Sequence, residues 1–551
     1  MSDVYNCHSK KVPDVSQCKL LDMSSTAFES RIAARRQNFK KASGDSQAMR
    51  RRREDATLQI RKKEKAEQLV RRRRLEMDDD EGSKATTKDN SSAPTKNDIP
   101  SLVTLLKSSD PDAALEALVS FRKMLSKEDN PPIADVIAAG VLPRFKYLLD
   151  NPTVSKMQFE AAWALTNVAS GNSEQTRAVI ELGAVDSFRN LLSSEDTDLQ
   201  EQSIWALANI AGDGAVVRDA CLERGVLPPL LAVIRAGKNI NIVRLGTWAV
   251  SNFCRGKPVP ALDRIVGALP TLAMVLGLDD VEALADALWA VSYICDGPTE
   301  RIDAILQSGM VPRMVHLLGH DSTQVHTPAL RAIGNIATGS PHQTGAVVDA
   351  GALPTLLKLI TSPRKTVRKE VVWTVSNICA DQQTQIQKVI ESGILGPIVE
   401  ILSGGADYDV RKEAAWTVCN LCSGGSPEQV KYLVDKYPTM AALSSILDIK
   451  DTKMVQVALE AFEGILRTGA YEQDKRDSST NHYVEALEER GALTKIEELQ
   501  QDESEDVYIR AVRILENYCD VEDENQAGDG NVHADGLGAA TTTSHARFAF
   551  A

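Results

Sequence analysis

A Gly-x-x-Pro tetrapeptide recurs through the chain at a nearly fixed interval. The tetrapeptides begin at Gly140, Gly225, Gly267, Gly309 and Gly351, and altered versions begin at Gly183 (GAVD) and Gly393 (GILGP). Successive glycines are 43, 42, 42, 42, 42 and 42 residues apart. This period indicates an array of supersecondary units that stack on one another, because each unit is too small to bury its apolar faces alone.

The chemistry of the tetrapeptide predicts the helices within one unit. The glycine is expected to end a short helix in the left-handed conformation, and the proline to begin the next helix, where its missing N–H costs nothing. Apolar residues follow at helical spacing, as at Leu353, Leu356 and Leu357. A polar turn and a third helix complete the unit. Three helices in about 42 residues are typical of armadillo repeats, with paired-helix HEAT repeats as the nearest alternative.

We therefore predict an all-α fold, a right-handed superhelical armadillo solenoid of about ten repeats over residues 98–523. The end repeats depart from the pattern, as expected where a solenoid meets water. The first, around Ile99 to Gly140, has no Trp. The ninth has KYPT at Lys436 in place of the glycine, and an insertion near Tyr471 to Asn481 precedes Gly491.

The third helices carry a Trp-x-x-x-Asn motif, and all six Trp of the chain stand in it. The pairs are Trp163 and Asn167, Trp205 and Asn209, Trp248 and Asn252, Trp289 and Tyr293, Arg331 and Asn335, Trp373 and Asn377, and Trp416 and Asn420. Residues i and i+4 share one helix face, so stacked repeats present a row of Trp beside a row of Asn.

Two interpretations of these rows compete. Trp is usually highly buried, so the rows could simply be core. However, a core position also accepts Leu or Phe, whereas here two amphipathic types recur together, and Asn is unfavourable inside a helix. An Asn amide can pair with both the N–H and C=O of an extended chain. Slots between adjacent indoles suit the stems of Lys or Arg. We favour a peptide-binding groove.

Acidic residues near the motif indicate a basic ligand. Three positions before the Trp register stand Glu160, Asp286, Glu370 and Glu413, and just after the helices stand Asp213, Asp296 and Asp381. Each alone is a solvated charge or a helix cap, but as a set along one groove they favour a basic peptide.

The net charge of −13 hides a strong asymmetry. Residues 27–75 hold 17 basic and six acidic residues, hence +11, whereas the remainder, with 46 basic and 70 acidic residues, is −24. The basic residues are Arg31, Arg35, Arg36, Lys40, Lys41, Arg50, Arg51, Arg52, Arg53, Arg61, Lys62, Lys63, Lys65, Arg71, Arg72, Arg73 and Arg74. A basic arm joined to an acidic body predicts electrostatic attraction between the two.

Other classes of protein receive little support. There is no apolar stretch of 18 residues and no secretory signal at the N-terminus. Nine scattered cysteines suit a reducing compartment, and Cys419 with Cys422 is better explained by buried small residues on a helix than by zinc or redox chemistry. No phosphate loop, metal cluster or Ser/His/Asp pattern is present, so we predict no enzyme activity, no catalytic residue, no metal and no cofactor.

The chain closely resembles the importin alpha (karyopherin alpha) family of nuclear import adaptors over nearly all of residues 27–523. The resemblance rests on the Trp/Asn ladder, WAVSYICDGPTERI at Trp289, PALRAIGNIATG at Pro328, and the basic arm. In that family the sixth repeat also has Arg in place of Trp, as at Arg331, and the fifth has the Tyr seen at Tyr293.

The resemblance implies two sites for nuclear localisation signals. The major site comprises Trp163, Asn167, Gly171, Thr176, Gln202, Trp205, Asn209, Asp213, Trp248 and Asn252, with Gly171, Thr176, Gln202 and Asp213 framing a lysine pocket. The minor site comprises Asp286, Trp289, Tyr293, Asp296, Arg331, Asn335, Glu370, Trp373, Asn377, Glu413, Trp416 and Asn420. The chain departs from the family at Leu245, where Asn is usual, and at Pro341, where an acidic residue is common.

The resemblance also implies a domain order and a set of partners. The order is a disordered N-terminus at 1–26, an importin-beta-binding arm at 27–75, a flexible linker at 76–97, the solenoid at 98–523 and a disordered acidic, low-complexity tail at 524–551. The cluster Arg71 to Arg74 resembles a localisation signal and is expected to compete with cargo for the groove until importin beta binds the arm.

The expected partners are cargo proteins bearing monopartite or bipartite signals, importin beta, a CAS-type export receptor with Ran-GTP acting at the acidic segment from Glu516, and nuclear pore proteins as further candidates. An unadorned solubilising tail explains that acidic segment equally well. The expected location is the cytoplasm and the nucleus, with shuttling between them.

Two other binding functions remain as alternatives. The Arg-rich arm could hold nucleic acid, but its basic clusters include one aromatic, Phe39, and the body is acidic, so we expect no nucleic-acid partner and no membrane partner. An armadillo scaffold related to the catenins would need a Lys- and Arg-rich groove for acidic ligands, which is the opposite of this one.

Overall fold

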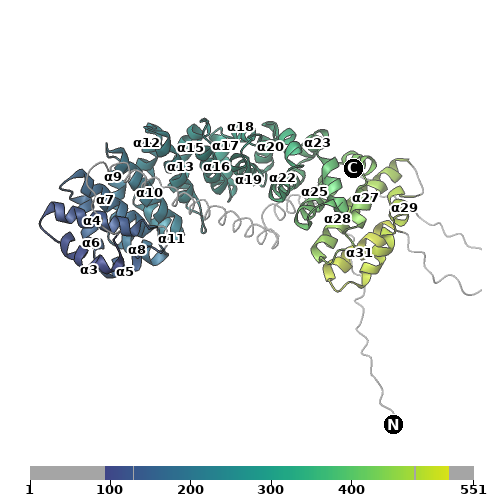
Figure 1. Ribbon diagram of the computed structural model, residues 1–551. Helices are drawn as coiled ribbons and strands as arrows, with labels where there is room; N and C mark the ends of the chain where they lie inside the picture. The colour runs from purple at the N-terminus through teal and green to yellow at the C-terminus, as the bar shows by residue number, and fades with distance from the viewer. Residues whose placement is uncertain (1–93, 128–129, 477–479, 520–551) are drawn as a thin grey trace, which may run out of the picture.

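The computed structural model describes residues 94–127, 130–476 and 480–519, and every regular element within these ranges is a helix. Figure 1 shows the helices stacked side by side into one curved solenoid. The prediction of an all-α armadillo architecture is confirmed. The basic arm, most of the linker and the C-terminal tail lie outside the described residues, so their predicted boundaries stay predictions.

The helices fall into three sets, one member of each set per repeat, except that the described part of the first repeat begins with its second helix. The third helices are α4 (Pro111–Leu125), α7 (Ser155–Ala169), α10 (Thr197–Asp213), α13 (Ile240–Cys254), α16 (Val281–Ile294), α19 (Thr323–Ile336), α22 (Lys365–Cys379), α25 (Tyr408–Gly424), α28 (Thr452–Arg476) and α31 (Glu505–Tyr518). The second helices are α3 (Ile99–Leu106), α6 (Leu142–Asp150), α9 (Ala184–Leu191), α12 (Leu227–Ala236), α15 (Leu269–Leu276), α18 (Val311–Leu317), α21 (Ala352–Leu359), α24 (Leu395–Glu400), α27 (Thr439–Ser444) and α30 (Ala492–Glu498). The first helices are α5 (Ile133–Ala138), α8 (Ser173–Glu181), α11 (Ala215–Glu223), α14 (Leu262–Ile265), α17 (Thr299–Gln307), α20 (Pro341–Asp349), α23 (Gln383–Glu391), α26 (Pro427–Lys436) and α29 (His482–Glu488). Short turns of helix are η2 (Lys96–Asp98), η3 (Val266–Ala268), η4 (Ile401–Gly405) and η5 (Leu499–Gln501).

The repeat glycines adopt the predicted left-handed conformation in all but one case. Positive φ angles occur at Gly140, Gly183, Gly225, Gly309, Gly351 and Gly393, from 67° to 84°. The expectation is wrong at Gly267, which lies inside η3 and is not among the glycines with positive φ. The reason is that α14 is only four residues long and runs through η3 directly into α15, so the chain does not reverse there.

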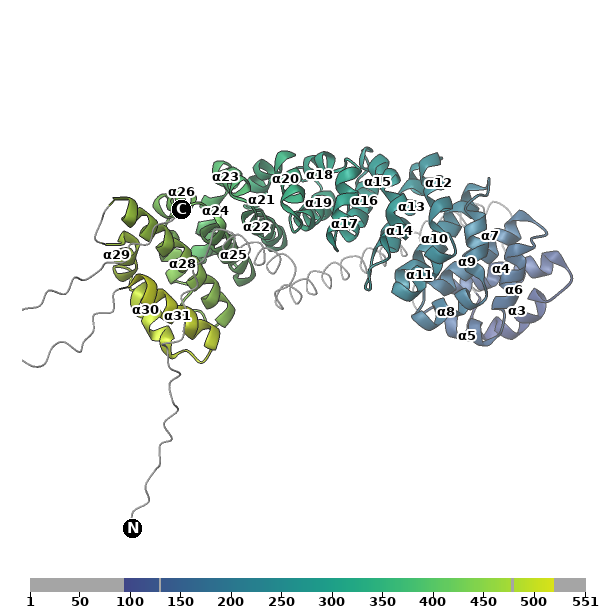
Figure 2. The ribbon, with the colours of Figure 1, turned by 180° about the vertical axis from the view of Figure 1, so that it is seen from behind.

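Each third helix packs against the third helix of the next repeat, from α4 through to α31. In Figures 1 and 2 helices such as α16, α19 and α22 lie along the inner side of the arc, and α12, α15 and α18 lie along its outer edge. The residues between Trp and Asn, such as Leu165, Leu207 and Val250, are fully buried and form the core between repeats. The period of the sequence therefore places the Trp and Asn rows on the concave face.

Polar residues in the turns before the third helices cap several of these helices. The Asp196 side chain accepts hydrogen bonds from the backbone N–H groups of Asp198 and Leu199, and Asp280 accepts from Ala283. Asp280 also pairs with Arg244 of the preceding repeat, with Nη2 and Oδ2 2.7 Å apart. The hydrogen bond from Arg244 lowers the pKa of Asp280 below its usual value.

Buried arginines stabilise the loop at residues 255–261, where the first helix is shortened to α14. Arg218, fully buried, donates to the carbonyls of Arg255 (2.6 Å) and Pro258 (2.8 Å). From the other side Arg301 donates to the carbonyl of Pro260 at 2.8 Å. Arginines of the two neighbouring repeats therefore hold the loop from both sides.

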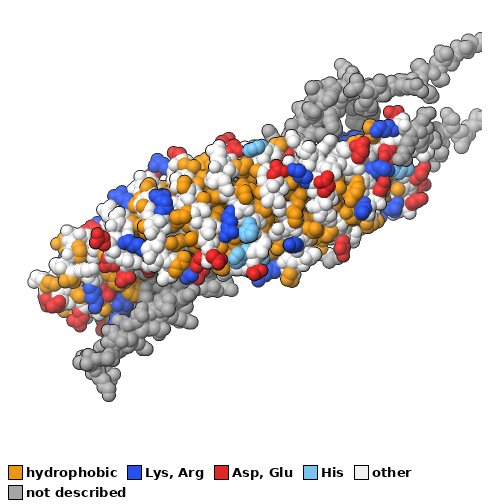
Figure 3. All heavy atoms as spheres, turned by 90° about the horizontal axis from the view of Figure 1, so that it is seen from above, with side chains coloured by type: hydrophobic (Ala, Val, Ile, Leu, Met, Phe, Trp, Pro, Cys, Tyr) orange, Lys and Arg blue, Asp and Glu red, His pale blue; other side chains and the backbone are white. Residues whose placement is uncertain are grey.

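The C-terminal repeats show the irregularities predicted for them. Helix α26 ends at Lys436 without a glycine turn, and Tyr437 continues in an extended conformation. Helix α28 runs on to Arg476, into the predicted insertion. Among the described helices, none combines the length and the apolar character needed to cross a membrane. The convex side, seen from above in Figure 3, mixes apolar side chains with charges of both signs.

Candidate peptide-binding groove

The Trp row is largely buried along the inner surface. Trp163, Trp205, Trp248 and Trp289 are 5–8% exposed, whereas Trp373 and Trp416 are half-buried. The ring centroids of Trp205 and Trp248 are 5.3 Å apart at an interplanar angle of 39°. An aliphatic stem between two rings needs about 7–8 Å, twice a carbon–carbon contact distance. The predicted slot between these two indoles is therefore closed here, because the rings bury their apolar faces against each other.

The Asn row joins consecutive repeats by hydrogen bonds. The Nδ2 group of Asn252 donates to the Ala208 carbonyl (3.1 Å), that of Asn335 to Ser292 (2.9 Å), and that of Asn420 to Ser376 (3.0 Å). Asn167 donates to the Ser126 hydroxyl at 2.9 Å. A primary amide carries two N–H groups and one carbonyl. One N–H of each amide therefore joins two repeats, a structural role that the spacing of the motif does not reveal. This bond does not use the amide carbonyl or the second N–H.

Asn209 departs from this pattern in the middle of the major-site residues. It is 1% exposed, and neither its Nδ2 nor its Oδ1 has a hydrogen-bond partner. Burying an amide without partners costs about 1–3 kcal/mol. A buried polar group left unsatisfied in this way is a candidate for contact with a ligand.

The predicted lysine pocket is built at the end of α7 and the start of α8. Thr176 donates from Oγ1 to the Ala169 carbonyl at 3.1 Å, and Asp213 accepts from the Ser173 hydroxyl at 2.9 Å. A Cβ at Gly171 would lie 1.9 Å from Gln175 Oε1. Gly171 is therefore needed for the capping box of α8, in addition to any space that it leaves for a ligand.

The same arrangement occurs a second time, four repeats further along the chain. The segment ASGNSEQT at residues 169–176 reappears as ATGSPHQT at residues 337–344. Thr344 donates to the Ala337 carbonyl at 3.3 Å, and a Cβ at Gly339 would again lie 1.9 Å from a glutamine Oε1. Asp381 stands where Asp213 stands in the first copy. Gly339 and Thr344 are absent from the predicted site, although comparing the repeats with one another would have found them.

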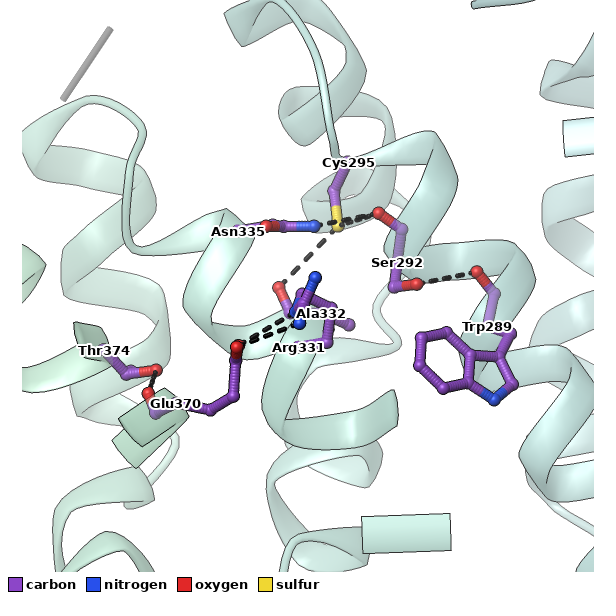
Figure 4. Close-up of polar contacts among 8 residues, drawn as sticks. All are labelled: Trp289, Ser292, Cys295, Arg331, Ala332, Asn335, Glu370 and Thr374. Carbon is purple, nitrogen blue, oxygen red and sulfur yellow. Dashed lines mark hydrogen bonds and ion pairs between the residues drawn. The ribbon is translucent and has the colours of Figure 1, made fainter. Parts of the chain in front are cut away.

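In the sixth repeat Arg331 takes the Trp position of the ladder and forms an ion pair. Arg331 donates from Nε to Glu370 Oε2 (2.8 Å) and from Nη2 to Oε1 (2.9 Å), as Figure 4 shows. Trp289 stacks on Tyr293 with centroids 6.0 Å apart. A cavity of about 140 Å³ opens beside these residues. Its lining comprises Cys254, Arg255, Gly256, Lys257, Val259, Trp289, Ser292, Tyr293, Asp296, Arg331 and Asn335.

The acidic residues near the ladder differ in how much of their charge faces the groove. Glu370 is neutralised by Arg331, and Glu160 is neutralised by Arg122, with Nε and Oε2 2.8 Å apart. Asp213 instead accepts from the neutral hydroxyl of Ser173, which orients the carboxylate and leaves its charge. Of the set of acids predicted to favour a basic peptide, Glu160 and Glu370 are therefore already paired within the protein.

The remaining predicted residues keep their positions on the inner helices. Gln202, Asp286, Glu413 and Asn377 are buried on α10, α16, α25 and α22. Leu245, the departure from the family, is half-buried against the core. The predicted arm residues from Arg31 to Arg74 lie outside the described residues.

The candidate metal and redox positions have a structural explanation. Within the described ranges, no group of three or more His, Cys, Asp or Glu side chains is placed to hold a metal ion. Cys419 and Cys422 are fully buried in α25, and burial raises the pKa of the Cys422 thiol. They are small core residues, as predicted from the sequence.

The fold and the ladder define the class of the protein, an armadillo-repeat solenoid. Its residues 129–170, 172–212, 298–338, 340–380 and 382–423 match the Armadillo/beta-catenin-like repeat, and residues 481–533 match the Atypical Arm repeat. Residues 35–119 match the Importin beta binding domain. A crystal structure of an engineered protein shares the fold with a TM-score of 0.69 and 30% identity, covering 76% of this chain and 98% of its own.

Curated relatives identify the family. The chain is 44% identical to importin subunit alpha-2 of Arabidopsis thaliana over 91% of this chain and 95% of that protein. It is 41% identical to importin subunit alpha-1b of Oryza sativa subsp. japonica over 78% and 80%, and 42% identical to importin subunit alpha-B of Dictyostelium discoideum over 90% and 95%. The chain belongs to the importin alpha family. Members of this family are transport adaptors and not enzymes, which agrees with the prediction of no enzyme activity.

Proposed function

We propose that this protein is an adaptor in nuclear protein import. Its Trp/Asn groove binds Lys- and Arg-rich nuclear localisation signals, both monopartite and bipartite, and its arm at residues 27–75 binds importin beta. The match to the Importin beta binding domain at residues 35–119 supports the second partner. The groove itself rests chiefly on one observation, the unsatisfied amide of Asn209 in the middle of the Trp ladder.

The amides of the Asn row fit the backbone of an extended peptide. An extended chain exposes one N–H and one C=O per residue. The carbonyl of an Asn side chain accepts from the first, and its second N–H donates to the other. Asn209 has both groups unused, so peptide binding would remove the cost of burying them.

The side chains of the ligand are selected by charge. The Asp213 carboxylate lies beside the Thr176 turn, with Gly171 at the end of α7, and suits one ammonium group of a lysine. The second copy of this turn, with Asp381, suits a second basic cluster. Two such pockets on one groove favour signals with two basic clusters, although one cluster would engage either pocket.

A peptide-binding experiment tests this assignment. A fluorescent peptide with a single Lys-rich cluster is titrated with residues 76–525, either unchanged or with Asp213→Lys. We expect the substitution to weaken binding at least tenfold, because an attraction becomes a repulsion. Asp186→Lys, on the outer helix α9, is the matched control for the charge change. Equal affinities for the unchanged chain and Asp213→Lys would remove the lysine pocket, and no binding by either would remove the proposed function.

The basic arm supplies an internal competitor. The cluster Arg71 to Arg74 has the composition of a ligand and is joined to the solenoid by a linker of about 20 residues, which gives it a high effective concentration. Importin beta relieves this competition when it binds the arm. Deleting residues 1–75 should then tighten cargo binding, and unchanged affinity would argue against autoinhibition.

Recycling and location follow from the adaptor role. The acidic sequence from Glu516 is the proposed contact for a CAS-type export receptor with Ran-GTP, because of its negative charge. Nuclear pore proteins are further candidate partners. An adaptor of this kind shuttles between cytoplasm and nucleus, which fluorescence recovery in the two compartments would test.

A further inference from the structure

The first repeat has an arginine where the next four repeats have a tryptophan. Arg122 on α4 is 41 positions before Trp163, in register with the ladder, and Ser126 is in register with Asn167. Arg331 stands at the same position of the sixth repeat. Both arginines pair with a glutamate three positions before the next Trp register, Glu160 for Arg122 and Glu370 for Arg331. The same Arg–Glu pairing therefore occurs at two positions of the Trp register.

Arg122 lies directly on the ladder. Its guanidinium carbon is 4.2 Å from the ring centroid of Trp163, at cation–π distance. Its Nε donates to Glu160 at 2.8 Å, and the two side chains are 10% and 5% exposed. Phe159 contacts the same indole edge-on, with centroids 5.6 Å apart. Trp163 thus already has a cation of the protein against its ring, and that cation is paired with a carboxylate.

The Asn row ends at the same place. Asn167 donates to the Ser126 hydroxyl instead of to a backbone carbonyl of α4. The side chain of Ser126 is a hydroxyl, so it lacks the paired carbonyl and N–H groups with which an Asn side chain can bond to the backbone of a ligand. Both rows of the ladder therefore stop between α4 and α7.

We infer that the Arg122–Glu160 pair closes the major site at its first-repeat end and limits how many basic residues of a ligand are selected. The inference rests on the proposed function. Arg122 occupies the position that a ligand cation would take against Trp163, and it neutralises Glu160, which would otherwise attract that cation. Arg122 already fills the position next to Trp163 on the first-repeat side. A ligand with a basic residue there is therefore bound no more tightly than a ligand with a neutral residue there.

Removing Arg122 should create a new subsite. Arg122→Ala leaves a carboxylate and an open indole face side by side, the two groups that hold a Lys or Arg. A purely structural brace behaves differently, because its loss weakens all peptides alike. A preference for Lys over Ala at a single peptide position would therefore show that Arg122 closes a subsite, whereas equal weakening of all peptides would show that it is a structural brace.

The test uses the full-length chain and peptides with one Lys-rich cluster, extended by one Lys or one Ala at the N-terminal or the C-terminal end. Affinities are measured by anisotropy. The wild type is expected to bind Lys- and Ala-extended peptides within twofold of each other. For Arg122→Ala, Lys should be preferred by about fivefold at one of the two ends. Arg122→Ala with Glu160→Gln should abolish the preference. Arg144→Ala, which removes an arginine stacked on Tyr147 of α6, should behave as the wild type.

Several results would overturn the inference. One is a wild-type preference for Lys at the extended position, and another is retained binding of the unextended peptide by Arg122→Ala with no preference at either end. Loss of unextended-peptide binding in Arg122→Ala, restored by Arg122→Lys, would make Arg122 a brace for Trp163. Failure of the wild type to bind any Lys-rich peptide, both as the full-length chain and as residues 76–525, would instead overturn the proposed function, and the inference with it.

Discussion

Asn209 and Asn252 offer a matched pair of substitutions on adjacent third helices. Both are buried, at 1% and 3% exposure, and both lose the same atoms on replacement by Ala. Only Asn252 makes a bond to the preceding repeat, to the Ala208 carbonyl at 3.1 Å. The amide of Asn209 has no partner. The loss of the side-chain volume is common to both variants, so their difference in stability reports the hydrogen bonding.

The expected difference follows from the two environments. Asn252→Ala loses a hydrogen bond with a net contribution of about 0.5–1.5 kcal/mol, whereas Asn209→Ala removes a buried group whose isolation costs about 1–3 kcal/mol. Because the loss in one variant and the relief in the other add, Asn209→Ala should be less destabilising by about 1.5–4.5 kcal/mol. Both substitutions should weaken peptide binding, because each removes a side-chain amide that is proposed to bond to the backbone of the ligand.

Hydrogen exchange read by mass spectrometry suits this comparison, because a solenoid unfolds locally. A difference of 1 kcal/mol corresponds to about a fivefold change in the exchange rate of amides in α10 and α13. We expect Asn252→Ala to accelerate exchange there at least fivefold more than Asn209→Ala, while both bind the peptide more weakly. Equal exchange rates would refute the role assigned to the Ala208 bond. Unchanged peptide affinity in Asn209→Ala would refute its role in the groove.

Three further predictions concern the scaffold. Gly171→Ala should speed exchange in α8 about fivefold, because its Cβ would displace Gln175 from the capping box at a cost of about 1 kcal/mol, whereas Gly214→Ala, with nothing within 4 Å of its Cβ, should not. Arg301→Met should destabilise the loop at 255–261 by about 1.5–3 kcal/mol through loss of the charged hydrogen bond to the Pro260 carbonyl at 2.8 Å. Unchanged exchange in that loop would contradict this stabilising role. Burial raises the pKa of Cys379 from 9.0 to about 12, so the folded state keeps a proton that the unfolded state loses, and the stability present below pH 9 should fall between pH 9 and 12. Urea midpoints measured against pH would show this decline, and Cys379→Ala should reduce it.

The sequence predicts the repeat architecture well because its signals are local. Gly and Pro at fixed spacing set the helix ends, and the apolar period sets the buried faces. Gly267 shows the limit of such a signal. Its tetrapeptide is intact, yet the shortened α14 removes the chain reversal that requires a positive φ, and two arginines from other repeats hold the altered loop.

The candidate groove is less predictable, because its residues serve two purposes. The i, i+4 spacing of Trp and Asn indicates a shared surface but does not reveal that the Asn amides also join neighbouring helices. Likewise, an acidic residue in register looks the same in sequence whether it is paired or not. Glu160 and Glu370 are cancelled by arginines about 40 residues away, a partnership that depends on stacking between repeats.

These pairings explain why the groove is divided. An uninterrupted ladder with seven acids would attract any long basic segment along its whole length. Arg122 and Arg331 each fill one position of the Trp register and cancel one carboxylate, so attraction is concentrated away from them. Asp213 accepts a hydrogen bond from the neutral hydroxyl of Ser173, a donor that orients this carboxylate without cancelling its charge. Under the proposed function, the two duplicated turns select for two separate basic clusters, and the sequence between those clusters is left unconstrained by charge attraction.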